Sequence, residues 1–257
     1  MTAIPSLFPD LAPDPPQGRP DEVLACADWA TNAHLLTDLA LLGYIRPEHR
    51  VCDVTYGLGG WWQRWRPADL TTHDLDPTKG DGIDFRNLPE ADETYDVVAF
   101  DPPYINPTPN STTDEFADRY GISGDRLSFT ELLQLMTDGL AECRRVLRPG
   151  GHLLVKAMAY TNGGTFRPVP ALLTAWAEPR GLDLVDEFVM RRNPGPLSKP
   201  TTGTRSRRNC STLLVFRRRA LAARSGQATF AEMTRTGGPM SRCTECAAAV
   251  IGEKGEG

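Results

Sequence analysis

The chain has 257 residues, a length that suits one α/β domain with extensions and is too short for two full domains. Its formal net charge of -5 excludes a generally basic coat for nucleic acid, so a polyanionic partner would need a local basic patch. No apolar run approaches the roughly twenty residues of a membrane span, and the Pro-rich beginning lacks a basic segment followed by an apolar core. The composition therefore predicts a soluble, cytoplasmic protein.

Six cysteines are scattered along the chain, several of them in apolar segments where reduced, buried thiols are usual. This usage indicates a reducing compartment. Cys243 and Cys246 have the spacing of a metal knuckle, but no second Cys or His pair lies near them in the sequence. We therefore expect no metal site and leave the purpose of this pair open.

The first twenty residues carry six prolines and little apolar periodicity, so we expect a disordered arm. From Asp21 to Leu42 apolar residues recur at helical spacing, which predicts a helix that ends at Gly43. Predicted strands then alternate with helices; the strands are at 51–54, 70–73, 96–100 and 152–159, and the helices at 129–147 and 169–178. This alternation predicts crossover units and a doubly wound, mostly parallel sheet.

Two apolar runs near the C-terminus, 182–190 and 211–217, are predicted to pair antiparallel and to close the sheet. Residues 191–219 hold nine Lys or Arg and no Asp or Glu, which in an acidic chain predicts a phosphate-binding surface. A solvated basic loop is the alternative. The candidate contacts are Arg191, Arg192, Lys199, Arg205, Arg207 and Arg208. Residues 220–257 have weak periodicity and are expected to form a flexible tail, so the folded domain should span 21–219.

The stretch VCDVTYGLGGWW, residues 51–62, is interpreted as a strand, an acidic residue and a Gly-rich turn that enters a helix. Its glycines at 57, 59 and 60 would let the backbone approach a ligand closely and expose N–H groups. The GxGG spacing differs from the GxGxxG of the dinucleotide fingerprint, which argues against a nicotinamide cofactor. The tryptophans that follow are expected to pack in the core rather than contact a cofactor.

Acidic residues are predicted at the ends of successive strands. Asp74 should follow the second strand, where an acid can accept hydrogen bonds from both hydroxyls of a ribose, with Asp76 as the alternative. Either acid could instead belong to a solvated turn. Asp84 should lie near the end of a short third strand, where a carboxylate can accept from an exocyclic amine such as that of adenine.

The fourth acid, Asp101, ends the apolar run 97–100 and is followed by two prolines and Tyr104. The prolines restrict the backbone directly behind the carboxylate. Together with Asp53, these acids would open on one edge of the sheet, which is where ligands bind in open α/β folds.

In this order and spacing, DVTYGLGG, DLDP, GIDF and above all DPPY resemble the S-adenosylmethionine-dependent amino-methyltransferases that act on adenine N6 or cytosine N4 of DNA. The resemblance covers about residues 23–218 and includes LRPGGHLLVK at a later helix-to-strand junction. It implies a Rossmann-like class I methyltransferase domain, whose mostly parallel seven-stranded sheet has an antiparallel C-terminal pair. It also implies S-adenosylmethionine as cofactor and a DNA base flipped out of the duplex.

The resemblance further implies roles for single residues. Asp101 and the Pro102 carbonyl would accept hydrogen bonds from the amine of the base, while Tyr104 stacks on its ring. The glycines would border the methionine part of the cofactor, Asp74 would bind its ribose and Asp84 its adenine amine. The implied cofactor residues are Asp53, Thr55, Gly57, Gly59, Asp74 and Asp84, and the implied catalytic residues are Asp101, Pro102, Pro103 and Tyr104.

In the family that the chain resembles, aspartate at the first motif position is commoner among adenine-directed members, so the resemblance favours adenine N6. The alternatives are cytosine N4 of DNA, then an amino group of an RNA base, and, in a different class, a non-catalytic nucleic-acid-binding module. Carbon-5 cytosine methylation is disfavoured because it needs a thiolate, usually in a Pro-Cys pair, and the chain has no Pro-Cys. No large target-recognition domain is evident, so the loops or a partner protein would read the sequence, or specificity is low. The oligomeric state and recognition sequence are not predicted.

Overall fold

The computed structural model describes residues 18–103, 127–162, 164–191 and 209–220. All of them belong to one compact unit, Met1–Ala220, and the second unit, Leu221–Gly257, lies outside the described residues together with the predicted tail. Most of the predicted N-terminal arm lies outside them too. The elements are η1 (Pro20–Glu22), β1 (Cys26–Ala27), α1 (Asn32–Leu41), β2 (Arg50–Asp53), β3 (Asp69–Thr72), β4 (Tyr95–Phe100), α3 (Phe129–Val146), β5 (Leu147–Ala157), β6 (Tyr160–Asn162), β7 (Thr165–Arg167), α4 (Val169–Ala177), η2 (Glu178–Arg180), β8 (Leu182–Arg191) and β9 (Cys210–Arg218).

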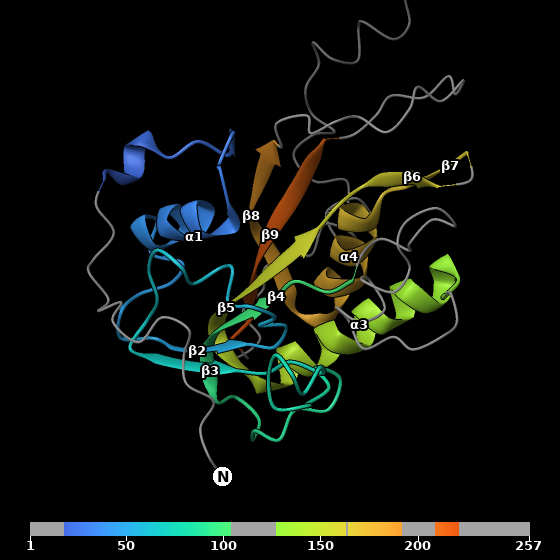
Figure 1. Cartoon of the computed structure of the whole chain (residues 1–257), viewed down its shortest axis with the longest axis horizontal. Coiled ribbons are helices and arrows are strands. Elements are labelled where there is room, and N and C mark those ends of the chain that lie inside the picture. Colours follow the sequence, from blue (N-terminus) through green and yellow to red (C-terminus); the bar gives the residue numbers. More distant parts are fainter. Residues whose placement is uncertain (1–17, 104–126, 163, 192–208, 221–257) are drawn as a thin grey trace, which may run out of the picture. The chain divides into compact units, whose positions relative to one another are not determined.

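A mixed seven-stranded sheet forms the centre of the described unit, in the order β1-β8-β9-β5-β4-β2-β3 (Figure 1). Strand β9 runs antiparallel to both of its neighbours, β5 and β8, and the other neighbouring pairs are parallel. This arrangement confirms the predicted mostly parallel sheet with an antiparallel C-terminal pair. A separate two-stranded hairpin, β6-β7, was not predicted.

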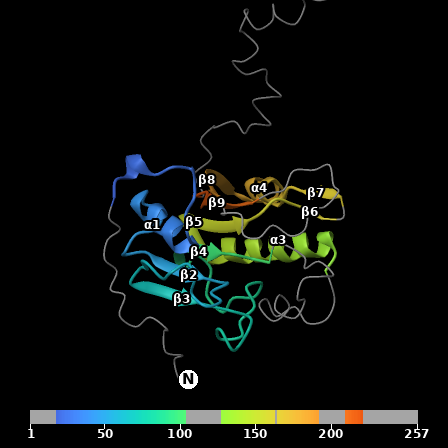
Figure 2. The same cartoon turned by 45° about the horizontal axis from the view of Figure 1, so that its top comes forward.

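Helices cover both faces of the sheet, as Figures 1 and 2 show. Alternation along β4 explains why both faces are apolar: Val97 and Ala99 pack in the cluster that includes α1, whereas Val98 and Phe100 pack in the cluster that includes α3 and α4. All four side chains are at most 1% exposed. The run VVAF therefore reads as continuously apolar because the strand is buried on both sides.

Local signals set the ends of α3. Ser128 and Glu131 form a capping box, in which each side chain accepts a hydrogen bond from the other's backbone N–H. The helix ends at Val146, one residue before the predicted end, and the following RPGG lies within β5. Among the described residues no helix is both long and apolar enough to cross a membrane.

The predicted helix over 21–42 is wrong in its first half. Only Asn32–Leu41 is α-helical, and Cys26–Ala27 forms the edge strand β1, which pairs with β8. The helix begins after Thr31, whose extended backbone marks the boundary. Backbone pairing with β8 at the sheet edge has overridden helical periodicity in the first half of the segment.

Two further predictions fail between β2 and β4. Residues 57–66 form turns and bends rather than a helix, and the described residues 81–90 form no third strand before or after Asp84. Three tryptophans in the first segment, Trp61, Trp62 and Trp65, pack against the face that α1 covers and are 8%, 3% and 2% exposed. They were correctly predicted as core residues, and their rings cover the sheet where the helix was expected.

Candidate active site

Three of the four predicted acids lie at the carboxyl ends of neighbouring strands. Asp53 is the last residue of β2, Asp74 lies two residues beyond β3, and Asp101 directly follows β4. Because β3, β2 and β4 are adjacent and parallel, these acids share one edge of the sheet. The sequence predicted this arrangement correctly.

The Gly-rich turn after β2 has the backbone that its glycines predict. Gly57 and Gly59 have φ values of 56° and 70°, in the left-handed region that other residues rarely adopt. Their N–H groups are used within the protein, because Gly57 donates to Asp74 Oδ2 (2.7 Å) and Gly59 donates to the Tyr56 carbonyl (2.9 Å). The prediction that these two N–H groups are exposed to a ligand is therefore wrong.

The turn nevertheless leaves room beside its backbone. A Cβ added to Gly60 would meet no atom within 4 Å, and one added to Gly57 would meet only the Thr55 carbonyl oxygen, at 4.0 Å. A Cβ at Gly59, in contrast, would lie 2.6 Å from the Tyr56 hydroxyl. The open space beside Gly57 and Gly60 fits a ligand that lies against the backbone, as the predicted cofactor would.

Asp74 is fixed by the backbone around it. In addition to the Gly57 bond, its Oδ1 accepts from the Asp76 N–H (2.9 Å), and Gly80 packs so closely that an added Cβ would lie 2.7 Å from the Asp74 Cβ. A carboxylate has about four acceptor positions, so acceptor capacity remains after these two bonds. Asp76, the alternative, forms an ion pair with Lys79 that lowers the pKa of Asp76 to about 2.

Asp53 is a buried acid with neutral hydrogen-bond donors. Its Oδ2 accepts from the Trp62 indole (2.6 Å) and its Oδ1 from the Thr55 N–H (3.0 Å). Burial raises the pKa of Asp53, the bonds from Trp62 and Thr55 oppose this, and the charges of Asp101 and Asp74 add to the increase, so that the pKa is about 7. This carboxyl group therefore titrates close to neutral pH.

Asp101 is held by the same Gly-rich segment. Its backbone N–H donates to the Thr55 hydroxyl (2.8 Å), and its Oδ2 accepts from the Trp61 indole (3.3 Å). Pro102 and Pro103 are buried directly behind it. Thr55 thus connects the turn after β2 to the turn after β4 and places an acceptor carboxylate beside the open Gly-rich turn.

Asp84 does not follow a strand, and its carboxylate is bonded to Arg86. The Arg86 Nε lies 3.0 Å from both carboxylate oxygens, and Arg86 Nη2 lies 2.5 Å from Oδ2. Burial alone would raise the pKa of Asp84, but the bonds from Arg86 hold it below its usual value. Its predicted contact with an adenine amine would require sharing the carboxylate with this guanidinium.

Other predicted site residues lie outside the described residues. Of the basic contacts, Arg191 is described, and its guanidinium pairs with Asp28 (2.9 Å) at the edge of the sheet. No group of three or more His, Cys, Asp or Glu in the described part of the chain could hold a metal ion. The residues outside the described part are Tyr104, Arg192, Lys199, Arg205, Arg207, Arg208, Cys243 and Cys246.

Sequence reasoning missed the polar functions of three side chains. Trp61 and Trp62 were expected only to pack, and their indoles also bond Asp101 and Asp53. Lys156 was not singled out, although it is 1% exposed at the carboxyl end of β5. A signal for Lys156 was present, because a lysine in the apolar run LLVKA must be buried if both faces of the strand are covered.

No protein-family model matches the chain, and no curated protein matches it. Similar solved structures include a protein described as a DNA modification methylase from Thermus thermophilus, solved with S-adenosyl-L-methionine. It is 17% identical, with 62% of this chain and 61% of that chain covered and a TM-score of 0.38. This chain thus spans about three fifths of that protein's length.

Two other similar structures are of proteins described as methyltransferases. The N-methyltransferase NodS from Bradyrhizobium japonicum is 14% identical over 73% of this chain and 94% of that one, with a TM-score of 0.45. The PvuII cytosine-N4-specific DNA methyltransferase is 14% identical over 57% and 48%, with a TM-score of 0.38.

Proposed function

We propose that this protein transfers a methyl group from S-adenosylmethionine to the exocyclic amine of a flipped-out base in DNA, adenine N6 in the first place. The observation that carries the proposal is the placement of Asp101, with two buried prolines behind it, beside the Gly-rich turn through the Thr55 hydroxyl. This puts an acceptor for an amine next to open space for a cofactor on one edge of the sheet.

The cofactor binds along the carboxyl ends of β2 and β3. The space beside Gly57 and Gly60 accommodates its methionine part, and the remaining acceptor capacity of Asp74 binds the ribose hydroxyls. Asp53 closes the floor, and Asp84 reaches the adenine amine. When bound, S-adenosylmethionine supplies an electrophilic methyl group on a positively charged sulfur.

Asp101 and the Pro102 carbonyl orient the target amine. Hydrogen bonds from its two N–H groups to these acceptors weaken conjugation of the nitrogen lone pair with the ring and direct that pair toward the methyl group. As the N–C bond formed, the S–C bond would break and leave a neutral thioether, and the amine would release one proton to solvent. The carboxylate also stabilises the positive charge that develops on the amine, and alignment of the reacting groups supplies much of the rate. Tyr104 stacks on the flipped base, whose removal from the duplex costs a few kcal/mol.

Cytosine N4 is the first alternative substrate because the same acceptors serve any exocyclic amine on an aromatic base. An amino group of an RNA base is the second. The decisive test is to incubate the protein with isotopically labelled S-adenosylmethionine and, separately, unmethylated duplex DNA and bulk RNA, followed by mass spectrometry of the nucleosides. Label in N6-methyladenine from DNA supports the proposal, and label in N4-methylcytosine or an RNA nucleoside changes the substrate while keeping the chemistry. Bound cofactor without label in any nucleoside would favour the non-catalytic module or a missing specificity partner.

In this proposal the basic residues within 191–219 contact the DNA phosphates. Neutralising Arg205, Arg207 and Arg208 together should weaken DNA binding about uniformly across sequences and reduce the slope of log Kobs against log salt by about 2 to 3. Fluorescence anisotropy with a labelled duplex at several salt concentrations measures both quantities. An unchanged slope would identify the segment as a solvated loop.

A further inference from the structure

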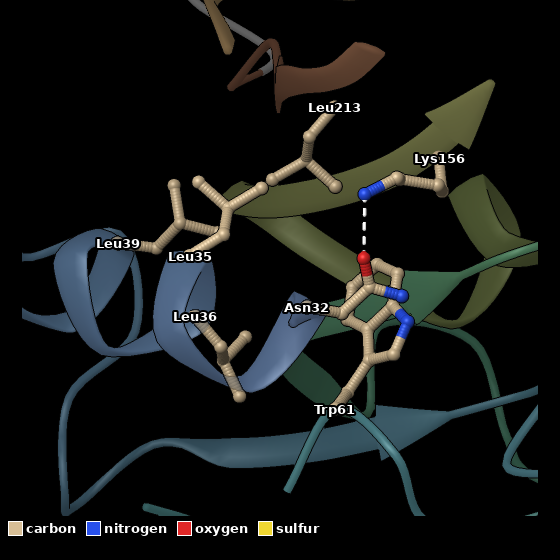
Figure 3. A pocket seen from close by; sticks show the side chains of 7 residues that line it. All are labelled: Asn32, Leu35, Leu36, Leu39, Trp61, Lys156 and Leu213. Carbon is tan, nitrogen blue, oxygen red and sulfur yellow. Dashed lines mark hydrogen bonds between the residues drawn. The ribbon is translucent and has the colours of Figure 1, made fainter. Parts of the chain in front are cut away.

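Lys156 is a buried cation in a pocket whose other walls are mostly apolar. It is 1% exposed, and the pocket around it is lined by Leu35, Leu36, Leu39 and Leu213 together with Asn32 and Trp61 (Figure 3). Its Nζ donates to the Asn32 Oδ1 at 2.7 Å. Burying an ammonium group is costly, and a methionine of similar length would suit these leucines better. Packing therefore does not explain why a lysine stands here.

The register of the sheet places Lys156 beside Asp101. Strands β4 and β5 are parallel, and Phe100 is paired with Val155, so the next residues along the two strands are Asp101 and Lys156. Phe100 and Val155 both pack on the α3 side of the sheet, so their successors point to the opposite face. Neighbouring strands lie about 4.8 Å apart, which brings the two side chains within range of a strong charge interaction.

Trp61 supports this placement independently. Its indole donates to the Asp101 Oδ2, and the same ring lines the pocket that holds Lys156 and Asn32. Figure 3 shows Asn32, Trp61 and Lys156 gathered on the α1 side of the sheet. Asp101 and Lys156 therefore contact the same indole-lined region from two strands.

The other titratable groups at this end of the sheet would oppose an ionised Asp101. Asp53 comes from β2 and Asp74 from the segment after β3, and both are acids; Tyr56 comes from the Gly-rich turn, and burial raises its pKa. From α1, Asn32 does not titrate and His34 bonds Thr31; from β9, Leu213 is apolar. Among the described residues, Arg66 also acts on Tyr56, and Lys156 is the cation that the strand register places next to Asp101.

We propose that Lys156 is a positioning residue for the site, whose ammonium group, held in place by Asn32, keeps Asp101 ionised and able to accept hydrogen bonds from the substrate amine. The proposal deepens the proposed function and rests on it for its catalytic meaning. The charge relationship between Lys156 and Asp101 does not depend on which substrate is methylated.

The direct test follows the titration of Asp101 itself and needs no activity. Protein labelled with ¹³C at aspartate carboxyls is titrated by NMR, and the Asp101 signal is assigned as the one that Asp101→Asn removes. Lys156→Met should move the Asp101 midpoint upward by about one pH unit or more, since loss of an adjacent opposite charge disfavours the carboxylate. Lys156→Arg should keep the wild-type midpoint. If Lys156→Met does not fold, Lys156→Gln removes the charge while retaining a donor to Asn32.

A matched control removes another cation at the same edge. Lys79→Met breaks the pair with Asp76 and should leave the Asp101 midpoint unchanged. An unchanged midpoint in Lys156→Met or Lys156→Gln would overturn the proposal, even if those variants were less stable. A shift in the Lys79 variant as large as that in the Lys156 variants would overturn it too.

The second readout is the pH profile of methyl transfer at saturating cofactor and DNA. In Lys156→Gln the acidic limb of kcat should move to higher pH by about the same one unit as the Asp101 midpoint, so that the rate falls up to about tenfold on that limb and recovers at higher pH. A loss of activity that is equal at every pH would contradict the proposed role. If wild-type protein methylates no substrate, the proposed function fails, and the NMR titration still decides the relationship between Lys156 and Asp101.

Discussion

Carboxyl groups at the two ends of the central strands have pKa values shifted in opposite directions. At the carboxyl end, Asp53 is held by an indole and a backbone N–H, and burial raises its pKa to about 7. At the amino end, Glu142 forms an ion pair with Arg145, whose hydrogen bond lowers the pKa of Glu142. The comparison teaches that the fold pairs Glu142 with a cation where segments are joined, whereas Asp53 at the carboxyl end is held by neutral donors alone.

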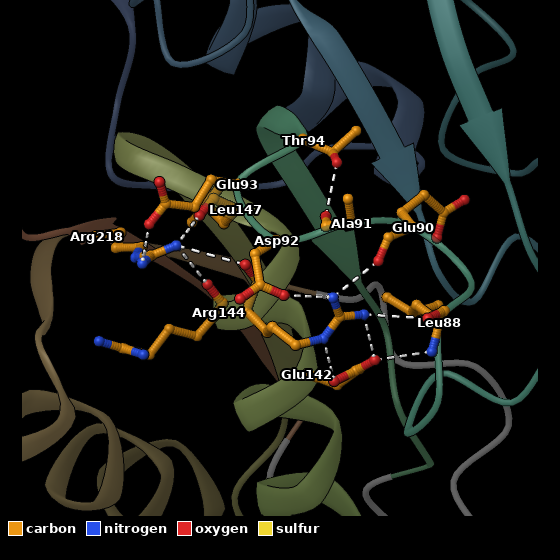
Figure 4. A network of polar contacts seen from close by, with 11 residues as sticks. Leu88, Glu90, Ala91, Asp92, Glu93, Thr94, Glu142, Arg144, Leu147 and Arg218 are labelled. Carbon is orange, nitrogen blue, oxygen red and sulfur yellow. Dashed lines mark hydrogen bonds and ion pairs between the residues drawn. The ribbon is translucent and has the colours of Figure 1, made fainter.

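At the amino end of the central strands, two guanidinium groups hold neighbouring segments together (Figure 4). Arg145 bonds the carbonyls of Leu88 and Glu90 and pairs with Asp92 and Glu142. Arg218, from the end of β9, pairs with Glu93 (2.6 Å) and bonds the Arg144 carbonyl (3.1 Å). These contacts join the segment before β4 to α3 and to β9, which lie later in the sequence.

The largest difference between the two ends should appear in Asp101→Ala. Loss of the acceptor carboxylate should reduce the methyl-transfer rate by about a thousandfold, comparable to removal of one group that stabilises developing charge. Binding of S-adenosylmethionine, measured by calorimetry, should change little. Asp101→Asn is the matched variant because it preserves shape. Near-normal turnover in either variant would show that Asp101 does not hold the substrate.

Asp74→Ala should act on the cofactor instead. The dissociation constant of S-adenosylmethionine should rise about thirtyfold, equivalent to about 2 kcal/mol for lost hydrogen bonds to a charged group. The turnover of the fully loaded enzyme should fall much less. Asp76→Ala serves as the control, and a larger effect in that variant would make Asp76 the ribose ligand.

Asp53→Asn should alter the pH dependence of stability. The pKa of Asp53 is about 7 in the folded protein and about 3.9 in an unfolded chain, so between these values the folded state holds a proton that the unfolded state has lost. Unfolding free energy should therefore decrease as pH rises through this window. Asp53→Asn should reduce the decrease between pH 5 and pH 7 by about 2 kcal/mol. Asp69→Asn, at an exposed pair with Arg50, should leave the profile as in wild type.

Arg145→Ala, at the amino end, should affect stability alone. Loss of its bonds to two carbonyls and two carboxylates should lower the unfolding free energy by about 1 to 2 kcal/mol, because the side chain is partly exposed. Urea denaturation measures this change. Arg50→Ala, at the exposed Asp69 pair, should cost about 0.5 kcal/mol or less. If stable Arg145→Ala protein lost methyl transfer, the amino end of the strands would serve catalysis as well as stability, contrary to this comparison.

Much of the sheet could be predicted because the signal for each strand lies in the residues of that strand. Runs such as VVAF are apolar and rich in valine, so β2, β3 and β4 and the acids that follow them, Asp53, Asp74 and Asp101, were placed correctly. The helix predicted from Asp21 failed because pairing of β1 with β8 depends on residues about 160 positions away. Local periodicity contains no information on such a partner.

The site was predictable only in outline for the same reason. The position of each acid after a strand predicted which acids meet at the carboxyl edge of the sheet. The hydrogen bonds from Trp61 and Trp62 could not be predicted because they depend on where the chain turns after Gly60. The neighbourhood of Lys156 and Asp101 depends on the register between β4 and β5. The predicted third strand is absent from residues 81–90, which are held by side-chain hydrogen bonds such as that between Arg86 and Asp84 and not by the backbone hydrogen bonds of a β-ladder.

The indoles at the carboxyl end give the protein a built-in optical reporter. Trp61 and Trp62 each donate their ring N–H to an acid of the candidate site, and both rings are buried. Indole emission responds to nearby charge and to exclusion of water. Intrinsic fluorescence should therefore follow ionisation of these acids and arrival of a ligand without any attached dye.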